Sequence, residues 1–113
     1  PDHLPGVRAH LEGVRFDLIT IDAGWTKLEL VLPVVKKFLK KNGIIIALLK
    51  PHYEAEKKDL TKGVLPSEIA EQVKNEVLEK IASCQFSIVN CIESPILGGA
   101  GNKEYSLLLT RQQ

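Results

Sequence analysis

Short runs of β-branched and apolar residues alternate along this chain with amphipathic segments, and this order restricts the fold more than any other feature. The runs predict buried strands at residues 15–22, 44–49, 86–94 and 104–110. Apolar residues at helical spacing predict two helices, over residues 26–41 and from Ser67 to residue 81. Strands that alternate with helices form right-handed βαβ crossovers, so we expect a parallel sheet covered by helices.

The last two predicted strands are joined by residues 95–103, which are too few for a crossover. We therefore expect them to form an antiparallel hairpin. The predicted fold class is α/β, with a mostly parallel sheet and an antiparallel last strand. Residues 50–66, which contain two prolines and a glycine, are expected to form a polar loop.

Helix boundaries are predicted from capping patterns. Thr26, with Glu29 three residues later, is expected to cap the first helix, and Ser67 is expected to cap the second. The segment "KKNG" ending at Gly43 is typical of a helix C-terminus. Pro33 is expected either in an early turn of the first helix or at a kink.

The charge of the chain is nearly balanced, since its 113 residues hold 15 Lys and Arg and 14 Asp and Glu. A net charge of +1 provides no overall basic field for nucleic acid. A group of lysines close together in the chain is either solvated surface or a local RNA-binding patch: Lys36, Lys37, Lys40, Lys41, Lys57, Lys58 and Lys62.

Cys84 and Cys91 have neither the number nor the spacing of a metal site, so we expect no metal and two buried, reduced thiols. No apolar run approaches the length of a membrane span, and no signal peptide is recognisable. We expect a soluble cytoplasmic protein that does not enter a membrane.

Three charged residues are predicted to meet at one edge of the sheet. Asp22 ends the first strand and Lys50 ends the second, and ligands of open α/β sheets bind outside the carboxyl ends of the strands. Glu104 begins the last strand, which returns from the same edge. We therefore expect Asp22, Lys50 and Glu104 to form a site.

Each of these residues also has a purely structural interpretation. Asp22 alone could be a turn residue, Lys50 a lysine that reaches from a strand end to solvent, and Glu104 a solvated hairpin residue. His52 and Tyr53 could line the site or pack the loop. The convergence of three residues from distant segments favours a site.

Three segments resemble a known family: "DLITIDAGWTKLELVLP", "IIIALLKPHYEA" with the later "KGVLP", and "SPILGGAGNKEYSLLL". In this order and spacing they are similar to the FtsJ-like RNA methyltransferases, and most of all to the TlyA-hemolysin branch. The resemblance covers residues 16–110. It implies a partial Rossmann-like methyltransferase fold and the transfer of a methyl group from S-adenosylmethionine to a ribose 2′-hydroxyl of RNA, with ribosomal RNA as the expected substrate.

The resemblance also implies the roles of individual residues. The family uses a Lys-Asp-Lys-Glu tetrad, which places the aspartate at Asp22, the second lysine at Lys50 and the glutamate at Glu104. Asp22 and Ala23 are the expected cofactor-binding residues. The family's first lysine, first strand, glycine-rich loop and S4-like domain would precede residue 1. Residues 1–113 are therefore expected to be the C-terminal portion of a single methyltransferase domain.

Two alternatives keep the fold but change the function. A truncated or degenerate module could lack activity and form a homodimer through exposed sheet edges. A simple RNA-binding module could use the lysine group. The charge state of Lys50 is also open, because burial lowers the pKa of a lysine whereas the nearby carboxylates of Asp22 and Glu104 raise it.

Overall fold

The computed structural model describes residues 13–22, 26–95 and 101–112. Its four strands form one sheet in the order β1-β2-β4-β3, with β1 at Phe16–Ile21, β2 at Leu39–Leu49, β3 at Phe86–Glu93 and β4 at Tyr105–Arg111. Strands β1 and β2 are parallel, and β4 is antiparallel to both of its neighbours, β2 and β3. The predicted fold class is confirmed, because β1, β2 and β3 run in one direction and the last strand opposes them.

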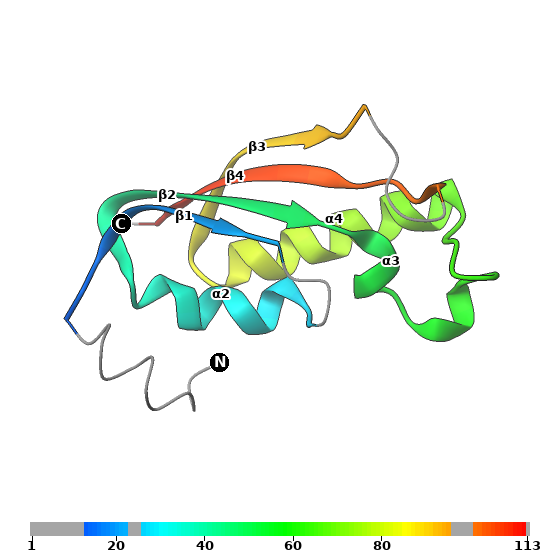
Figure 1. Ribbon diagram of the computed structural model, residues 1–113, viewed down its shortest axis with the longest axis horizontal. Coiled ribbons are helices and arrows are strands. Elements are labelled where there is room, and N and C mark those ends of the chain that lie inside the picture. Colours follow the sequence, from blue (N-terminus) through cyan, green and yellow to red (C-terminus); the bar gives the residue numbers. More distant parts are fainter. Residues whose placement is uncertain (1–12, 23–25, 96–100, 113) are drawn as a thin grey trace.

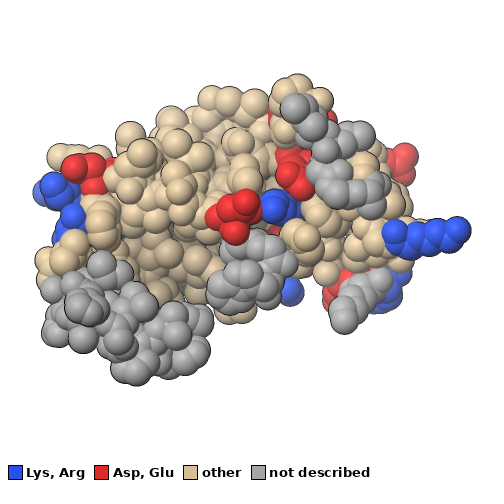
Figure 2. Space-filling model, in the orientation of Figure 1, with Lys and Arg blue, Asp and Glu red and all other residues tan. Residues whose placement is uncertain are grey.

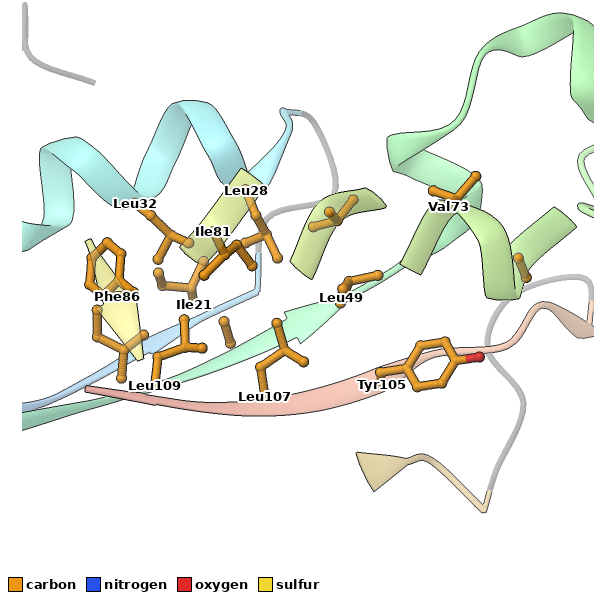
Figure 3. Close-up of a cluster of buried hydrophobic side chains, with 14 of the residues drawn as sticks. Ile21, Leu28, Leu32, Leu49, Val73, Ile81, Phe86, Tyr105, Leu107 and Leu109 are labelled. Carbon is orange, nitrogen blue, oxygen red and sulfur yellow. The ribbon is translucent and has the colours of Figure 1, made fainter. Parts of the chain in front are cut away.

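Helices α2 (Leu28–Lys36) and α4 (Ser67–Ser83) cover one face of this sheet (Figure 1). Alternate residues of the central strands point toward them: Ile45, Ala47 and Leu49 of β2 and Tyr105, Leu107 and Leu109 of β4 are all buried. Figure 3 shows Leu49, Leu107 and Leu109 packed beneath side chains of the two helices. The strand period of two therefore builds the core on one face alone.

The residues between these buried positions form the opposite face of the sheet, here called the outer face. Leu18 lies beside Ile44 across strands, and Ile46 lies beside Leu108. Leu18, Ile44 and Ile46 are exposed, as is Ile92 of β3. The described residues thus leave an apolar surface uncovered, and Figure 2 shows a broad area over the strands without charged side chains.

The prediction for the start of the first helix was wrong. Helix α2 begins at Leu28, and its N-cap residue, Lys27, makes no side-chain capping bond. The carboxylate of Glu54, 26 residues later, accepts the Leu28 N–H at 3.1 Å. A long-range contact therefore supplies the acceptor that the capping-box spacing assigned to Thr26.

The end of the first helix also differs from the prediction. Helix α2 stops at Lys36, with Pro33 inside it, and β2 begins at Leu39, so the segment "KKNG" is strand. Leu39 is fully buried, and the carbonyl of Phe38 accepts the Phe16 N–H at 2.7 Å. A Cβ on Gly43 would lie 2.5 Å from the Leu39 side chain, so the glycine allows this part of β2 to bend back on itself.

Residues 50–66 are more ordered than the predicted polar loop. They hold the short helix α3 (Pro51–Glu54), a 3₁₀ turn at Lys57–Asp59 and a bridge between Thr61 and Val64. Pro51 occupies the first turn of α3, where a missing N–H costs nothing. Ser67 does not cap α4 but is its first residue, and Pro66 holds the N-cap position without a side-chain bond.

The strand predictions agree with the structure to within a few residues, apart from the earlier start of β2. Cys84 and Cys91 are free thiols, and both are partly buried. None of the helices within the described ranges is long and apolar enough to cross a membrane.

Candidate functional site

Asp22 and Lys50 form an ion pair at the edge of the sheet where β1 and β2 end. Because the two strands are parallel neighbours, the residues that follow them lie side by side. The Lys50 Nζ lies 2.7 Å from the Asp22 Oδ1. The Lys50 side chain is 17% exposed and the Asp22 side chain 63%, so the pair is held by the protein on one side and open to solvent on the other.

Glu104 reaches the same edge from β4. Leu49 pairs with Tyr105 in the antiparallel register of β2 and β4, and the next residues outward are Lys50 and Glu104. The backbone carbonyl of Glu104 accepts the Ser94 N–H at 2.8 Å, which ties it to the end of β3. The structure therefore brings all three sequence-predicted residues to one edge.

The carboxylates raise the pKa of Lys50 above its ordinary value. The hydrogen bond to Asp22 is the largest cause, and the negative charges of Asp22 and Glu104 add to it, whereas burial acts in the opposite direction. The question that the sequence left open is thus decided in favour of the charged form. At neutral pH, Lys50 is an ammonium group that can donate hydrogen bonds and stabilise negative charge.

His52 and Tyr53 follow Lys50 on α3 and border the site. The Lys50 Nζ lies 5.6 Å from the centre of the Tyr53 ring, within the range of a cation–π contact, and the His52 ring lies 4.4 Å from that of Tyr53. The His52 Nδ1 is buried without a hydrogen-bond partner among the described residues. Burial lowers the pKa of His52, so this ring is neutral at pH 7.

One residue of the predicted site lies outside the described residues. Ala23, the second expected cofactor-binding residue, belongs to the range 23–25, and most of the loop between β3 and β4 belongs to the range 96–100, which is also outside them. Asn102, at the end of this loop, is described and buried, and sequence reasoning did not single it out. A polar residue at a loop end gives no signal of burial in the sequence alone.

Three described members of the lysine group have contacts away from Lys50. Lys40 pairs with Asp17 at 3.3 Å, near the opposite end of the sheet. Lys36 donates to the carbonyl of Cys84 at 3.2 Å, and Lys58 lies 3.3 Å from Glu56. In Figure 2 the charged side chains of this view lie in separate small groups. These contacts favour surface pairing over a single basic patch.

Glu71 of α4 anchors the beginning of β4 close to the site. Its carboxylate accepts a 2.5 Å hydrogen bond from the Tyr105 hydroxyl and a 3.0 Å bond from Lys74. Lys103 lies 3.5 Å from the same carboxylate. The Tyr105 hydrogen bond is the largest cause that lowers the pKa of Glu71 to about 2, while burial raises the pKa of the Tyr105 phenol.

We expect Glu71→Gln to reduce the acid sensitivity of the fold. A carboxylate whose pKa is lower in the folded state stabilises the fold above its unfolded pKa, near 4.5, and loses this contribution as the pH falls toward 2. The side chain is 40% exposed, so water screens the effect and we expect a small difference. Urea unfolding at pH 7, 4 and 2.5 measures it. Glu76→Gln, on the exposed side of α4, is the control, and an equal acid response of both variants and the wild type would contradict the assignment.

A solved structure shares the fold of this chain. An O-methyltransferase of Bacillus cereus, solved in complex with SAH, matches 95% of this chain and 47% of its own chain with a TM-score of 0.55 at 16% identity. At this identity the likeness concerns the fold alone. The three charged residues lie near the carboxyl ends of the parallel strands, which is where open α/β sheets bind their ligands.

The family follows from the sequence comparisons. The model of the FtsJ-like methyltransferase family matches residues 1–111, and the chain belongs to this family. Hemolysin A of Brachyspira hyodysenteriae is 33% identical over 90 residues, which are 78% of this chain and 38% of that protein. A Bacillus subtilis protein, YqxC, provisionally described as an rRNA methyltransferase, is 32% identical over 98 residues, 82% of this chain and 34% of its own length.

A solved structure agrees with these relatives. A protein of Streptococcus thermophilus, provisionally described as a hemolysin, has a TM-score of 0.84 and 30% identity over 93% of this chain. The match covers 38% of that protein. This chain thus spans little more than a third of the length of the relatives it matches.

Proposed function

We propose that this chain carries the catalytic edge of an S-adenosylmethionine-dependent methyltransferase that modifies a ribose 2′-hydroxyl of RNA, with ribosomal RNA as the substrate. The observation that carries the proposal is the Asp22–Lys50 ion pair, with Glu104 beside it, at the carboxyl edge of the sheet. Membership of the FtsJ-like family and the likeness to a protein provisionally described as an rRNA methyltransferase support it.

The residues of this edge fit the chemistry of the cofactor. S-adenosylmethionine supplies a methyl group on a positively charged sulfonium, which becomes a neutral thioether when the methyl carbon bonds to oxygen. Asp22 presents an exposed carboxylate at the end of β1, and such a group attracts a cation or accepts a hydrogen bond. Asp22 would hold the cofactor together with Ala23, the next residue.

Lys50 acts as the electrostatic catalyst in this mechanism. Its ammonium group donates a hydrogen bond to the ribose 2′-oxygen and stabilises the negative charge that grows there as the hydroxyl loses its proton to water at the open side of the site. Asp22 and Glu104 keep Lys50 charged and orient it. Recognition of the 2′-hydroxyl also distinguishes RNA from DNA.

A methyl-transfer assay tests the proposal. The protein at its natural length is incubated with methyl-labelled S-adenosylmethionine and either ribosomal RNA or DNA of the same sequence. The products are digested to nucleosides and analysed by mass spectrometry. We expect label in 2′-O-methylated nucleosides from RNA alone. Label on a base would overturn the assignment of the ribose as the methylated group. The absence of methyl transfer to any RNA would overturn the proposed methyltransferase activity.

The outer face favours a second candidate function, a module that self-associates. Leu18, Ile44 and Ile46 form an apolar surface that the described residues leave exposed, beside β1, the outermost strand of the described sheet, and a second copy of this chain would bury the same surface symmetrically. Light scattering after size-exclusion chromatography tests it: we expect a dimer that Ile46→Lys converts to a monomer, whereas Leu30→Lys, on α2, leaves it intact. A monomeric wild-type chain would rule this candidate out.

A further inference from the structure

We propose that Asn102 and Tyr105 are positioning residues that form a clamp around Glu104 and hold its carboxylate opposite Lys50. The two residues lie two positions before and one position after Glu104, and each is tied to a different part of the chain. The catalytic consequence of the clamp rests on the proposed function, whereas its effect on Lys50 can be measured without it.

Asn102 fixes the chain just before Glu104. Its side chain is buried, its Oδ1 accepts the Leu65 N–H at 2.9 Å, and its Nδ2 donates to the carbonyl of Gly63 at 2.9 Å. The turn that it binds is closed by the bridge between Thr61 and Val64. An amide is suited to this position because it offers a donor and an acceptor at once.

Tyr105 fixes the chain just after Glu104. Its ring is buried on the helix side of the sheet, and its hydroxyl donates to Glu71. The Lys74 Nζ lies 5.2 Å from the centre of the ring, and Lys103 connects Glu71 with Glu93, at 3.5 and 3.8 Å. The start of β4 is therefore bound to α4 by a connected set of polar groups, which specifies one geometry.

The two anchors hold the chain on both sides of Glu104, which directly precedes β4. Tyr105 is buried on the helix side and pairs with Leu49, so Glu104 and Lys50 are the next residues outward from this pair, and the charge of Glu104 acts on Lys50. The turn bound by Asn102 lies in the segment that follows α3, and α3 begins directly after Lys50. Asn102 thus links the two segments that carry the opposing charges.

Buried polar contacts that hold a loop cost desolvation free energy, because each polar group loses its hydrogen bonds to water. Apolar packing would stabilise the loop equally well, but it would not define the position of a neighbouring carboxylate as closely. The contacts are concentrated on both sides of one charged residue. This arrangement is the reason to assign them a positioning role for Glu104.

The pKa of Lys50 reports the position of Glu104. Asp22, Glu104 and Tyr53 raise this pKa, and His52 is a further titratable neighbour. Glu104→Gln removes one of these charges, and the resulting decrease in the pKa of Lys50 is the reference with which the other variants are compared. In NMR titrations of the chain with ¹³C-labelled lysine, we expect Asn102→Ala and Tyr105→Phe each to lower the pKa of Lys50 by part of that shift.

A double variant separates positioning from general damage. We expect Asn102→Ala to have no further effect on the pKa of Lys50 when Glu104 is already Gln, since the clamp acts through that carboxylate. Val77→Ala, in the core of α4, is the control: it destabilises the fold but leaves the pKa of Lys50 unchanged.

An unchanged pKa of Lys50 in folded Tyr105→Phe would overturn the clamp, as would an equal shift from Val77→Ala. Tyr105→Phe removes only the hydroxyl, so the test stands even where Asn102→Ala fails to fold. The titration needs neither RNA nor cofactor. The absence of methyl transfer would therefore overturn the proposed function, whereas the clamp would still be tested by the pKa of Lys50.

Discussion

Lys50→Ala is expected to reduce methyl transfer to RNA by about 10²–10³-fold in the protein at its natural length, the range found when one preorganised donor is removed from a charge-stabilising site. The variant loses the ammonium group that faces the growing negative charge on the ribose oxygen. Binding of RNA and cofactor should change much less, since this interaction is strongest in the transition state. The measurement is kcat and KM for labelled methyl transfer.

The control for this prediction is Lys58→Ala. This variant loses an exposed lysine from the 3₁₀ turn that follows α3 and should retain full activity. Folding should survive in Lys50→Ala, because the Asp22 carboxylate left behind is already largely solvated. A circular dichroism spectrum checks this point. Wild-type rates in Lys50→Ala would remove Lys50 from the mechanism, and the proposal with it.

The convergence of Asp22, Lys50 and Glu104 could be predicted from the sequence because it depends on topology. Three strand ends and their directions follow from β-branched runs, and parallel neighbours must end at a shared edge. The charge state of Lys50 could not be predicted. It depends on the 2.7 Å separation from Asp22 and on partial burial, and neither is encoded in a local pattern.

The boundary between α2 and β2 shows where local patterns fail. Leu39 fits the apolar stripe of a helix as well as the inward face of a strand, so periodicity alone could not assign it. Its pairing with Phe16 decides in favour of the strand. The start of α2 is set similarly, by Glu54 from α3. The contacts of Asn102 and Glu71 also join distant segments, and no local pattern indicates them.

Phe86→Ala is expected to destabilise the fold by about 3–5 kcal/mol, the usual range for emptying a buried phenylalanine site. Phe86 begins β3, is fully buried, and lies within the core cluster that also holds Leu32, Ile81 and Leu109 (Figure 3). Domains of this size are stable by only about 5–15 kcal/mol, so the variant should be close to unfolding. Urea titration followed by circular dichroism measures the loss.

The matched control is Val89→Ala on the same strand. Val89 is 57% exposed, and truncation of an exposed side chain should change stability by less than about 0.5 kcal/mol. The contrast tests the central feature of the fold, a sheet whose helix-covered face holds the core. A loss in Val89→Ala as large as that in Phe86→Ala would contradict this arrangement, whereas a large loss in Phe86→Ala alone would support it.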